Sequence, residues 1–178
     1  MSELREPFTL GAMPPNAPML TVDVHDVAAP IATIFSLARD VAAWPRHLAH
    51  YRSVEFIERS RDGGGVVTMR ANRPFGAVNW PTWWTSEMQV SPDGATEPWI
   101  RFRHIRGITT GMEVLWSFTR RRELTHVAIV HMWNGPRWPV IGKLAARRVI
   151  GPVFVHGIAS RTLAGLARVA EWTHREQA

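Results

Sequence analysis

The sequence of 178 residues contains no cysteine. This absence excludes disulfide bonds, thiolate nucleophiles and zinc sites built on cysteine. No uninterrupted apolar run approaches the roughly 20 residues that a membrane-spanning helix needs. The N-terminal residues also lack the basic and then apolar pattern of a signal peptide. We therefore expect a cytoplasmic protein without a transmembrane segment.

The short motifs of the common catalytic classes are missing as well. There is no Walker phosphate-binding loop, no Gly-x-Gly-x-x-Gly fingerprint, no His-Glu-x-x-His metal site and no Gly-x-Ser-x-Gly elbow. His47 and His50 have a spacing that could suit a metal, but no carboxylate accompanies them in the pattern. We therefore expect neither a metal nor an organic cofactor.

Lysine is scarce: Lys143 is the only one, and arginine carries nearly all of the positive charge behind the formal net charge of +6. A basic chain can attract nucleic acid or anionic lipid weakly. The arginine clusters, however, lie near the ends of expected strands and helices, at 101–106, 120–122 and 147–148. This placement favours a solvated surface over a nucleic-acid site. A docking surface for an acidic partner, for example an acyl carrier protein, is the alternative.

Tryptophan, in contrast, is abundant, with nine residues. Indole rings supply large, rigid surfaces with one N–H each, which suits an aromatic-lined pocket. The alternative is that most of these rings simply fill the core.

Alternating apolar and polar residues predict a sheet of about seven antiparallel strands. In the first strand, Leu20, Val22 and Val24 alternate with polar neighbours, as in a half-buried strand. Glycine-rich turns at 62–65 and 91–94 separate later strands, and residues 73–79 look irregular. The expected strands are 19–25, 51–59, 66–72, 80–90, 99–106, 112–121 and 125–133.

Helical patterns frame the strands. Pro30 opens a short helix, and Asp40 is a candidate N-cap for a second one. A long helix ends the chain, with Gly151–Pro152 expected to bend the segment before it. Its apolar face has helical spacing and comprises Val155, Ala159, Leu163, Leu166 and Ala170. We expect a flexible N-terminal arm over residues 1–17 and one ligand-binding domain over 18–174.

The stretch 40–51 contains a Trp44–Pro45 pair that interrupts a helical pattern. Proline disfavours the α region for the residue before it, so Trp44 should lie at a break between short helices and could plug one end of a cavity. Together with the order of elements, this stretch resembles the START-like, helix-grip (SRPBCC) superfamily, and most closely its polyketide cyclase/dehydrase branch. The resemblance spans about Leu20 to Trp172.

The resemblance implies an α+β fold. In that superfamily a curved antiparallel sheet wraps around one long C-terminal helix, two short helices follow the first strand, and a cavity lies between sheet and helix.

Strand alternation predicts that the cavity lining is apolar and aromatic. The polar exceptions are Ser86, His104 and His131, with Tyr51, the only tyrosine, at the mouth. Imidazole titrates near neutrality and suits acid–base chemistry. The alternatives are that the two histidines are core residues bonded to the backbone and that Ser86 is structural. Arg70 could point inward, but the pattern favours its neighbours Met69 and Ala71.

The resemblance also implies a function. Aromatase/cyclases of the tetracenomycin type bind a poly-β-ketone chain and drive aldol condensation followed by dehydration. Their Asp-x-x-x-Trp-Pro segment ends in a tyrosine, and Asp40, Trp44, Pro45 and Tyr51 match it. We therefore expect Tyr51 and His131 to be catalytic. The expected substrate-binding residues are Trp84, Ser86, Met88, Phe102, His104, Trp116 and Trp133.

One position departs from the family pattern. Met88 lies where the family has a pocket arginine. The alternative function is therefore a non-catalytic carrier of a lipid or quinone, similar to the coenzyme Q-binding branch. The basic pair Arg147–Arg148 and the apolar segment 149–155 would then contact a membrane surface. A protein-docking module, like the co-chaperone members, is a third class.

Overall fold

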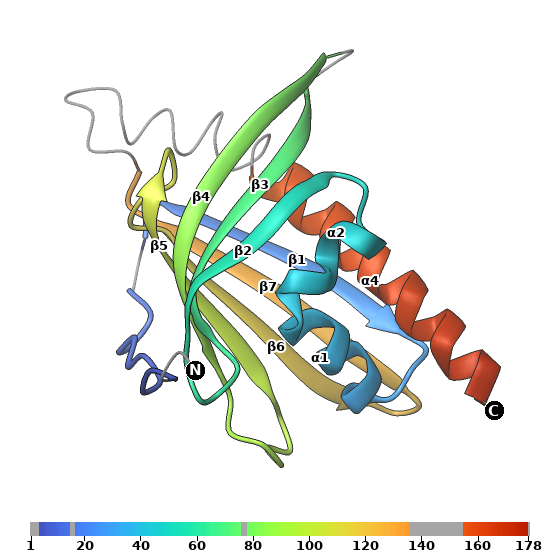
Figure 1. Cartoon of the computed structure of the whole chain (residues 1–178). Coiled ribbons are helices and arrows are strands. Elements are labelled where there is room, and N and C mark those ends of the chain that lie inside the picture. The colour runs from blue at the N-terminus through green and yellow to red at the C-terminus, as the bar shows by residue number, and fades with distance from the viewer. Residues whose placement is uncertain (1–3, 15–16, 76–77, 136–154, 178) are drawn as a thin grey trace.

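The computed structural model describes residues 4–14, 17–75, 78–135 and 155–177. Within these residues, one seven-stranded sheet and a long C-terminal helix dominate (Figure 1). The strands are β1 (Met19–Val27), β2 (Tyr51–Arg59), β3 (Gly65–Phe75), β4 (Val78–Val90), β5 (Trp99–Gly107), β6 (Glu113–Arg121) and β7 (Leu124–Trp133).

The sheet is antiparallel, with the order β1-β7-β6-β5-β4-β3-β2. Strands β2 to β7 pair with their neighbours in sequence, and β1 closes the series by pairing with β7. Sharp turns make this possible. Gly63 and Gly65 have φ angles of 87° and 138° in the β2–β3 turn, a conformation that favours glycine. Gly94 has a φ of 82° in the β4–β5 turn, so the glycine turns expected at 62–65 and 91–94 are both confirmed.

The expectation of irregular structure at 73–79 is wrong. β3 continues to Phe75, β4 begins at Val78, and these two residues pair in register. Pro74 fits in a strand here because the paired part of β2 ends opposite Ala71, which leaves β3 a single partner strand near its end.

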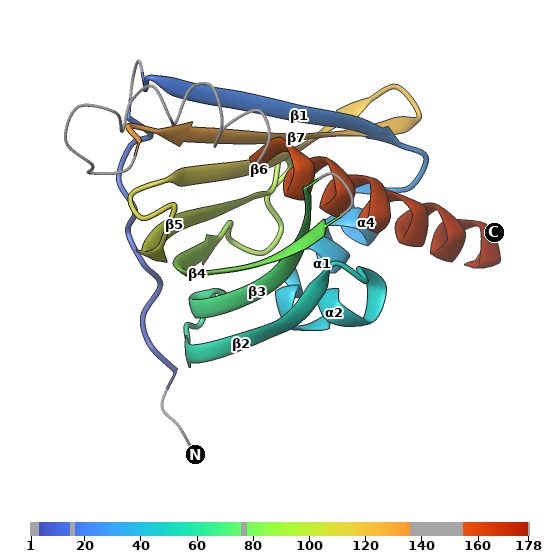
Figure 2. The same ribbon diagram turned by 90° about the horizontal axis from the view of Figure 1, so that it is seen from above.

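The helices are α1 (Ile31–Arg39), the 3-10 turn η1 (Val41–Ala43), α2 (Trp44–His47) and α4 (His156–Gln177). Figure 2 shows that the curved sheet wraps around α4, while α1 and α2 lie beside that helix. This is the α+β helix-grip arrangement that the sequence predicted. The expected bend at Gly151–Pro152 and the basic pair Arg147–Arg148 lie outside the described residues.

Three details of the short helices differ from expectation. α1 begins at Ile31, with Pro30 as its N-cap. Asp40 precedes η1, but its side chain makes no capping hydrogen bond. Trp44 does lie at the junction of η1 and α2, yet its φ and ψ of −53° and −39° are helical, against the usual preference before proline. The break therefore lies in the hydrogen-bond pattern, not in the dihedral angles of Trp44.

β1 is a strand as predicted, with buried apolar residues at its two ends, but the three alternating apolar residues between them face outward. Leu20, Val22 and Val24 are exposed, whereas Asp23 is buried. Asp23 lies under the start of α4, where 2.5 Å separates its Oδ1 from His156 Nδ1. Burial raises the pKa of the Asp23 carboxyl, and the charge of His156 partly offsets this effect.

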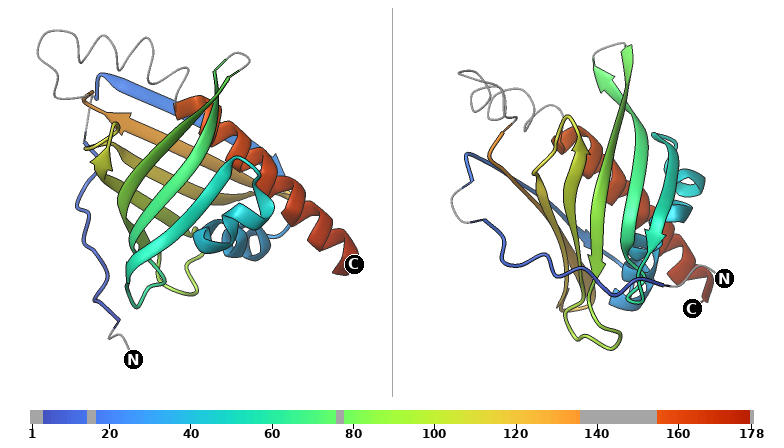
Figure 3. Two further views of the ribbon diagram at one scale, coloured as in Figure 1. Left: turned by 45° about the horizontal axis from the view of Figure 1, so that its top comes forward. Right: turned by 60° about the vertical axis from the view of Figure 1, so that its left-hand side comes forward.

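The N-terminal segment crosses the outer face of the sheet from β2 to β5 (Figure 3). Its Arg5 backbone pairs with the end of β2, and Leu10 is buried. Arg103 donates hydrogen bonds to the Leu10 carbonyl and to the buried carboxylate of Glu113. This segment thus has hydrogen-bond partners at the end of β2 and on β5.

Candidate functional site

Four adjacent strands supply the walls of the site through their alternation. On β5 to β7, every second side chain is buried, and the described part of β4 contributes Thr82, Trp84, Ser86 and Met88 to the same face. The inward sets predicted on β5, β6 and β7 are confirmed by burial. On β3, Met69 and Ala71 are buried, and Arg70 points outward to Ser53 and Glu55.

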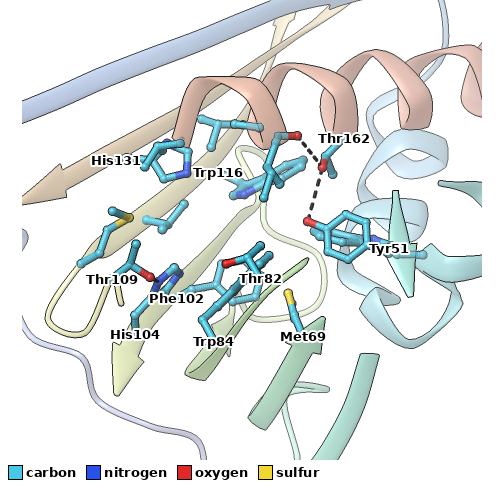
Figure 4. Close-up of a pocket in the computed structure, with 17 residues that line it drawn as sticks. Tyr51, Met69, Thr82, Trp84, Phe102, His104, Thr109, Trp116, His131 and Thr162 are labelled. Atoms are coloured by element: carbon cyan, nitrogen blue, oxygen red, sulfur yellow. Dashed lines mark hydrogen bonds between the residues drawn. The ribbon is translucent and has the colours of Figure 1, made fainter. Parts of the chain in front are cut away.

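A pocket lies between these strands and α4 (Figure 4). The space inside the pocket is about 620 Å³ when its open mouth is included. Its cavity volume is about 70 Å³. Among the described lining residues there is no carboxylate, guanidinium or ammonium group. The lining comprises Trp44, Tyr51, Met69, Thr82, Trp84, Phe102, His104, Thr109, Met112, Val114, Trp116, Ile129, His131, Val155, Ile158, Ala159 and Thr162.

Six of the nine residues predicted for the site line this pocket together. They are Tyr51, Trp84, Phe102, His104, Trp116 and His131. The other three, Ser86, Met88 and Trp133, face inward and are buried, but they lie outside the described lining. Trp133 donates its indole N–H to the Thr110 carbonyl. Met88, at the position where an arginine was expected, is fully buried.

Trp44 lines the pocket next to Tyr51. Its indole N–H donates to the Leu37 carbonyl over 3.1 Å, which anchors the ring to α1. The ring centroid lies 5.2 Å from that of Tyr51 and 5.7 Å from that of Trp116. Such spacings are typical of favourable aromatic pairs. The indole therefore packs against the Tyr51 ring inside the pocket.

Tyr51 begins β2 and directs its hydroxyl toward α4 (Figure 4). The distance from its Oη to Thr162 Oγ1 is 3.3 Å. Thr162 Oγ1 also lies 3.0 Å from His50 Nε2. Burial raises the pKa of the Tyr51 phenol strongly, and the Thr162 hydrogen bond only partly opposes this. The phenol is therefore neutral across the physiological range.

Two histidines occupy the opposite side of the pocket. His104 Nδ1 lies 2.7 Å from Thr109 Oγ1, and its ring stacks on Trp84 at 5.9 Å. His131 Nδ1 is buried without a hydrogen-bond partner among the described residues. Burial lowers the pKa of each histidine to about 3, and for His131 the neighbouring His104 contributes further. Both imidazoles are therefore neutral at neutral pH.

Sequence reasoning missed three threonines of the lining: Thr82, Thr109 and Thr162. Thr82 shares the inward alternation of Trp84, so the β4 pattern contained a usable signal. Thr162 is one helical turn from Ile158 and Ala159 on α4, and the same periodicity could have found it. Thr109 lies between β5 and β6, where neither periodicity applies.

The family match agrees with this geometry. The family described as polyketide cyclase / dehydrase and lipid transport matches residues 27–151. The chain belongs to this family. Its members include proteins that bind hydrophobic ligands, which fits an aromatic pocket of this kind. No curated protein matches the sequence.

Solved structures support the fold. A protein from Thermus thermophilus is 18% identical, with a TM-score of 0.67 over 86% of this chain and 98% of the other. The Zhui aromatase/cyclase from Streptomyces sp. R1128 is also 18% identical, with a TM-score of 0.64 over 85% and 93%. A STAR-related lipid transfer protein from Xanthomonas axonopodis is 13% identical, with a TM-score of 0.55 over 89% of both chains.

The family name and these neighbours span both cyclases and lipid-transfer proteins. At such sequence identities the solved structures establish the fold alone. In the described parts of the chain, no helix is both long and apolar enough to cross a membrane.

Proposed function

We propose that the pocket binds a neutral, hydrophobic polyketide or aromatic ligand and that the protein promotes its aldol cyclisation and dehydration. One observation carries the proposal. Opposite sides of an aromatic cavity present a neutral phenol, Tyr51, and a neutral imidazole, His131, whose Nδ1 has no partner among the described residues (Figure 4). The aromatic walls favour a flat ligand, and the lack of charged groups in the described lining favours a neutral one.

The reaction needs one base and one hydrogen-bond donor. His131 accepts a proton from a methylene group, the resulting enolate carbon attacks a second carbonyl of the same chain, and Tyr51 donates to the oxygen that gains negative charge. Loss of water from the new alcohol then completes the aromatic ring. Because the pKa of His131 is about 3, it is a weak base. Its substrate is therefore a methylene already acidified by two flanking carbonyls.

The size of the cavity constrains the ligand further. Pockets for small-molecule ligands usually measure about 300–1,000 Å³. The cavity volume of about 70 Å³ is far below this range. Binding therefore has to displace side chains of the lining. Met69 and Met112 are well suited to move, because methionine has three rotatable bonds and adapts to irregular shapes.

A second candidate is a non-catalytic carrier of a lipid or quinone. The absence of charged groups from the described lining favours it, since no cation anchors an enolate there. The position expected to hold an arginine is occupied by Met88, outside the lining. A quinone would still benefit from Tyr51, because its carbonyl oxygen can accept the phenol hydrogen bond.

The first experiment identifies the natural ligand. The protein is purified from its native host under mild conditions, and the bound small molecule is extracted and analysed by mass spectrometry. A polyketide supports cyclase function. A phospholipid or isoprenoid quinone as the sole bound species would overturn it in favour of the carrier.

The second experiment tests the chemistry on a synthetic poly-β-ketone thioester. We expect Tyr51→Phe and His131→Ala to lower turnover by at least about tenfold, which is below the usual range for general acid–base groups and so a lenient threshold. Thr68→Val is the matched control, because Thr68 bonds to Thr85 away from the pocket. If both site variants match this control in turnover, the catalytic assignment is wrong.

A further inference from the structure

The hydroxyl of Thr162 has more hydrogen-bond neighbours than it has protons. It lies 2.8 Å from the Ile158 carbonyl, 3.0 Å from His50 Nε2 and 3.3 Å from Tyr51 Oη. A threonine hydroxyl carries one proton and accepts through its lone pairs. The Thr162 hydroxyl donates toward both the Ile158 carbonyl and Tyr51 Oη, so its single proton is shared between two acceptors. His50 Nε2, in the tautomer that carries a proton there, can then donate to Thr162 Oγ1.

This arrangement sets the direction of the Tyr51 hydroxyl. Its oxygen accepts from Thr162, so its own proton is left for a ligand in the pocket. A cyclisation that ends in dehydration requires such an acid near the leaving hydroxyl. Burial raises the pKa of Tyr51 strongly, so a phenolate left behind in the cavity would be costly. Tyr51 can therefore act as an acid only if its proton is replaced as it leaves.

His50 lies at the other end of this chain of hydrogen bonds. Its ring centroid is 4.8 Å from that of Tyr51, and the residue is half-buried. Burial first, and the charge of Arg161 second, lower the pKa of His50 to about 4, so the ring is neutral at neutral pH. Among the described residues, Nε2 has a hydrogen-bond partner and Nδ1 has none. Nδ1 is therefore available to solvent.

We propose that Tyr51, Thr162 and His50 form a proton relay that connects the pocket to solvent, with Thr162 as its positioning residue. The relay rests on the proposed cyclase function. As the C–O bond of the ligand alcohol breaks, the Tyr51 proton moves to the departing oxygen and water leaves. The Thr162 hydroxyl turns from Ile158 and passes its proton to Tyr51 Oη. His50 Nε2 gives its proton to Thr162, and a solvent acid protonates Nδ1. His50 ends neutral, as the other tautomer.

Tyr51 is the only tyrosine in the chain, so its hydroxyl can be observed without a ligand. In Raman spectra, the intensity ratio of the tyrosine Fermi doublet distinguishes a phenol whose oxygen accepts a hydrogen bond from one whose oxygen does not. We expect the wild type to show the acceptor signature. Thr162→Val removes the donor with little change in shape and should abolish the signature. Thr162→Ser should restore it.

Thr173→Val is the matched control. Thr173 makes the same bond to the carbonyl four residues earlier on α4, at 2.9 Å from Val169, but lies outside the described lining of the pocket. The control should keep the acceptor signature. A wild-type spectrum identical to that of Thr162→Val would overturn the positioning role.

His50→Gln separates positioning from proton transfer. The glutamine amide can still donate to Thr162, but it cannot take up a proton on one atom and release another as imidazole does. We expect the acceptor signature of Tyr51 to remain, while turnover of the poly-β-ketone falls by at least about tenfold. Wild-type turnover in His50→Gln would overturn the relay.

The two proposals can fail separately. If Tyr51→Phe turns over substrate at the wild-type rate, the catalytic role of the phenol is wrong and the relay falls with it. If Tyr51→Phe is impaired while Thr162→Val and His50→Gln are not, the proposed function stands and the relay alone is overturned.

Discussion

Acid should destabilise the folded protein through two pocket histidines. His104 and His131 are each 8% exposed, and their pKa values are lowered to about 3. A histidine in the unfolded chain has a pKa of about 6.5. Between these two pKa values the unfolded chain binds protons that the folded chain does not bind. Stability is therefore fully present above about pH 6.5 and is lost as the pH falls toward the folded pKa.

The size of the effect follows from linkage. Each such histidine costs about 1.4 kcal/mol per pH unit within this window. From about pH 5.5 to about pH 4, one histidine accounts for roughly 2 kcal/mol and both for roughly 4 kcal/mol. Native domains are stable by only about 5–15 kcal/mol, so the loss is large. Half-buried His50 contributes to the loss of stability in the same direction, but its partial exposure makes that contribution smaller.

The assay is urea denaturation at several pH values. We expect His104→Gln and His131→Gln each to reduce the slope of stability against pH by about 1.4 kcal/mol per unit. His25→Gln, which removes an exposed imidazole on β1, is the control and should leave the slope unchanged. Equal slopes for the wild type and both pocket variants would refute the claim that burial keeps these rings neutral.

Two further substitutions test packing and burial. A Cβ at Gly165 would overlap Leu48 Cδ2, so Gly165→Ala should destabilise the protein by about 1–3 kcal/mol, whereas in a Leu48→Ala background it should be neutral or stabilising. Thermal denaturation of the four proteins checks this, and equal effects in both backgrounds would contradict it. Because burial raises the pKa of Asp23, Asp23→Asn should increase the free energy of unfolding at pH 7 but not at about pH 3. A loss of stability at pH 7 would show that the contact with His156 outweighs the cost of burying the charge.

Alternation predicted the inward faces of β5, β6 and β7 well. The period of a strand is two residues, and burying Phe102 costs less than burying Arg103, so the choice of face was unambiguous. The same reasoning brought Trp84, His104 and His131 to one cavity. It did not work for β1, where Leu20 and its apolar neighbours are exposed. There the packing of α4 over β1 buries Asp23 in contact with His156, and a local pattern contains no such information.

The sequence also did not predict how far along each strand the cavity extends. Ser86 and Met88 share the inward face of Trp84, yet the pocket lies toward the other half of β4, around Thr82 and Trp84. Periodicity tells which face a residue occupies, but it does not tell how far along the strand the cavity extends.

The sequence by itself determined the order of strands and helices along the chain and the apolar, aromatic character of the cavity, because these follow from local periodicity and turn chemistry. The family came from the resemblance of the stretch 40–51 and of the order of elements. Only the tertiary structure decided which polar groups meet. Residues 50 and 51 are adjacent, but Thr162 is 111 residues beyond Tyr51, and the docking of α4 beside β2 brings its hydroxyl within reach of both. Contacts of this kind depend on how two elements are docked, and no spacing along the chain encodes that distance.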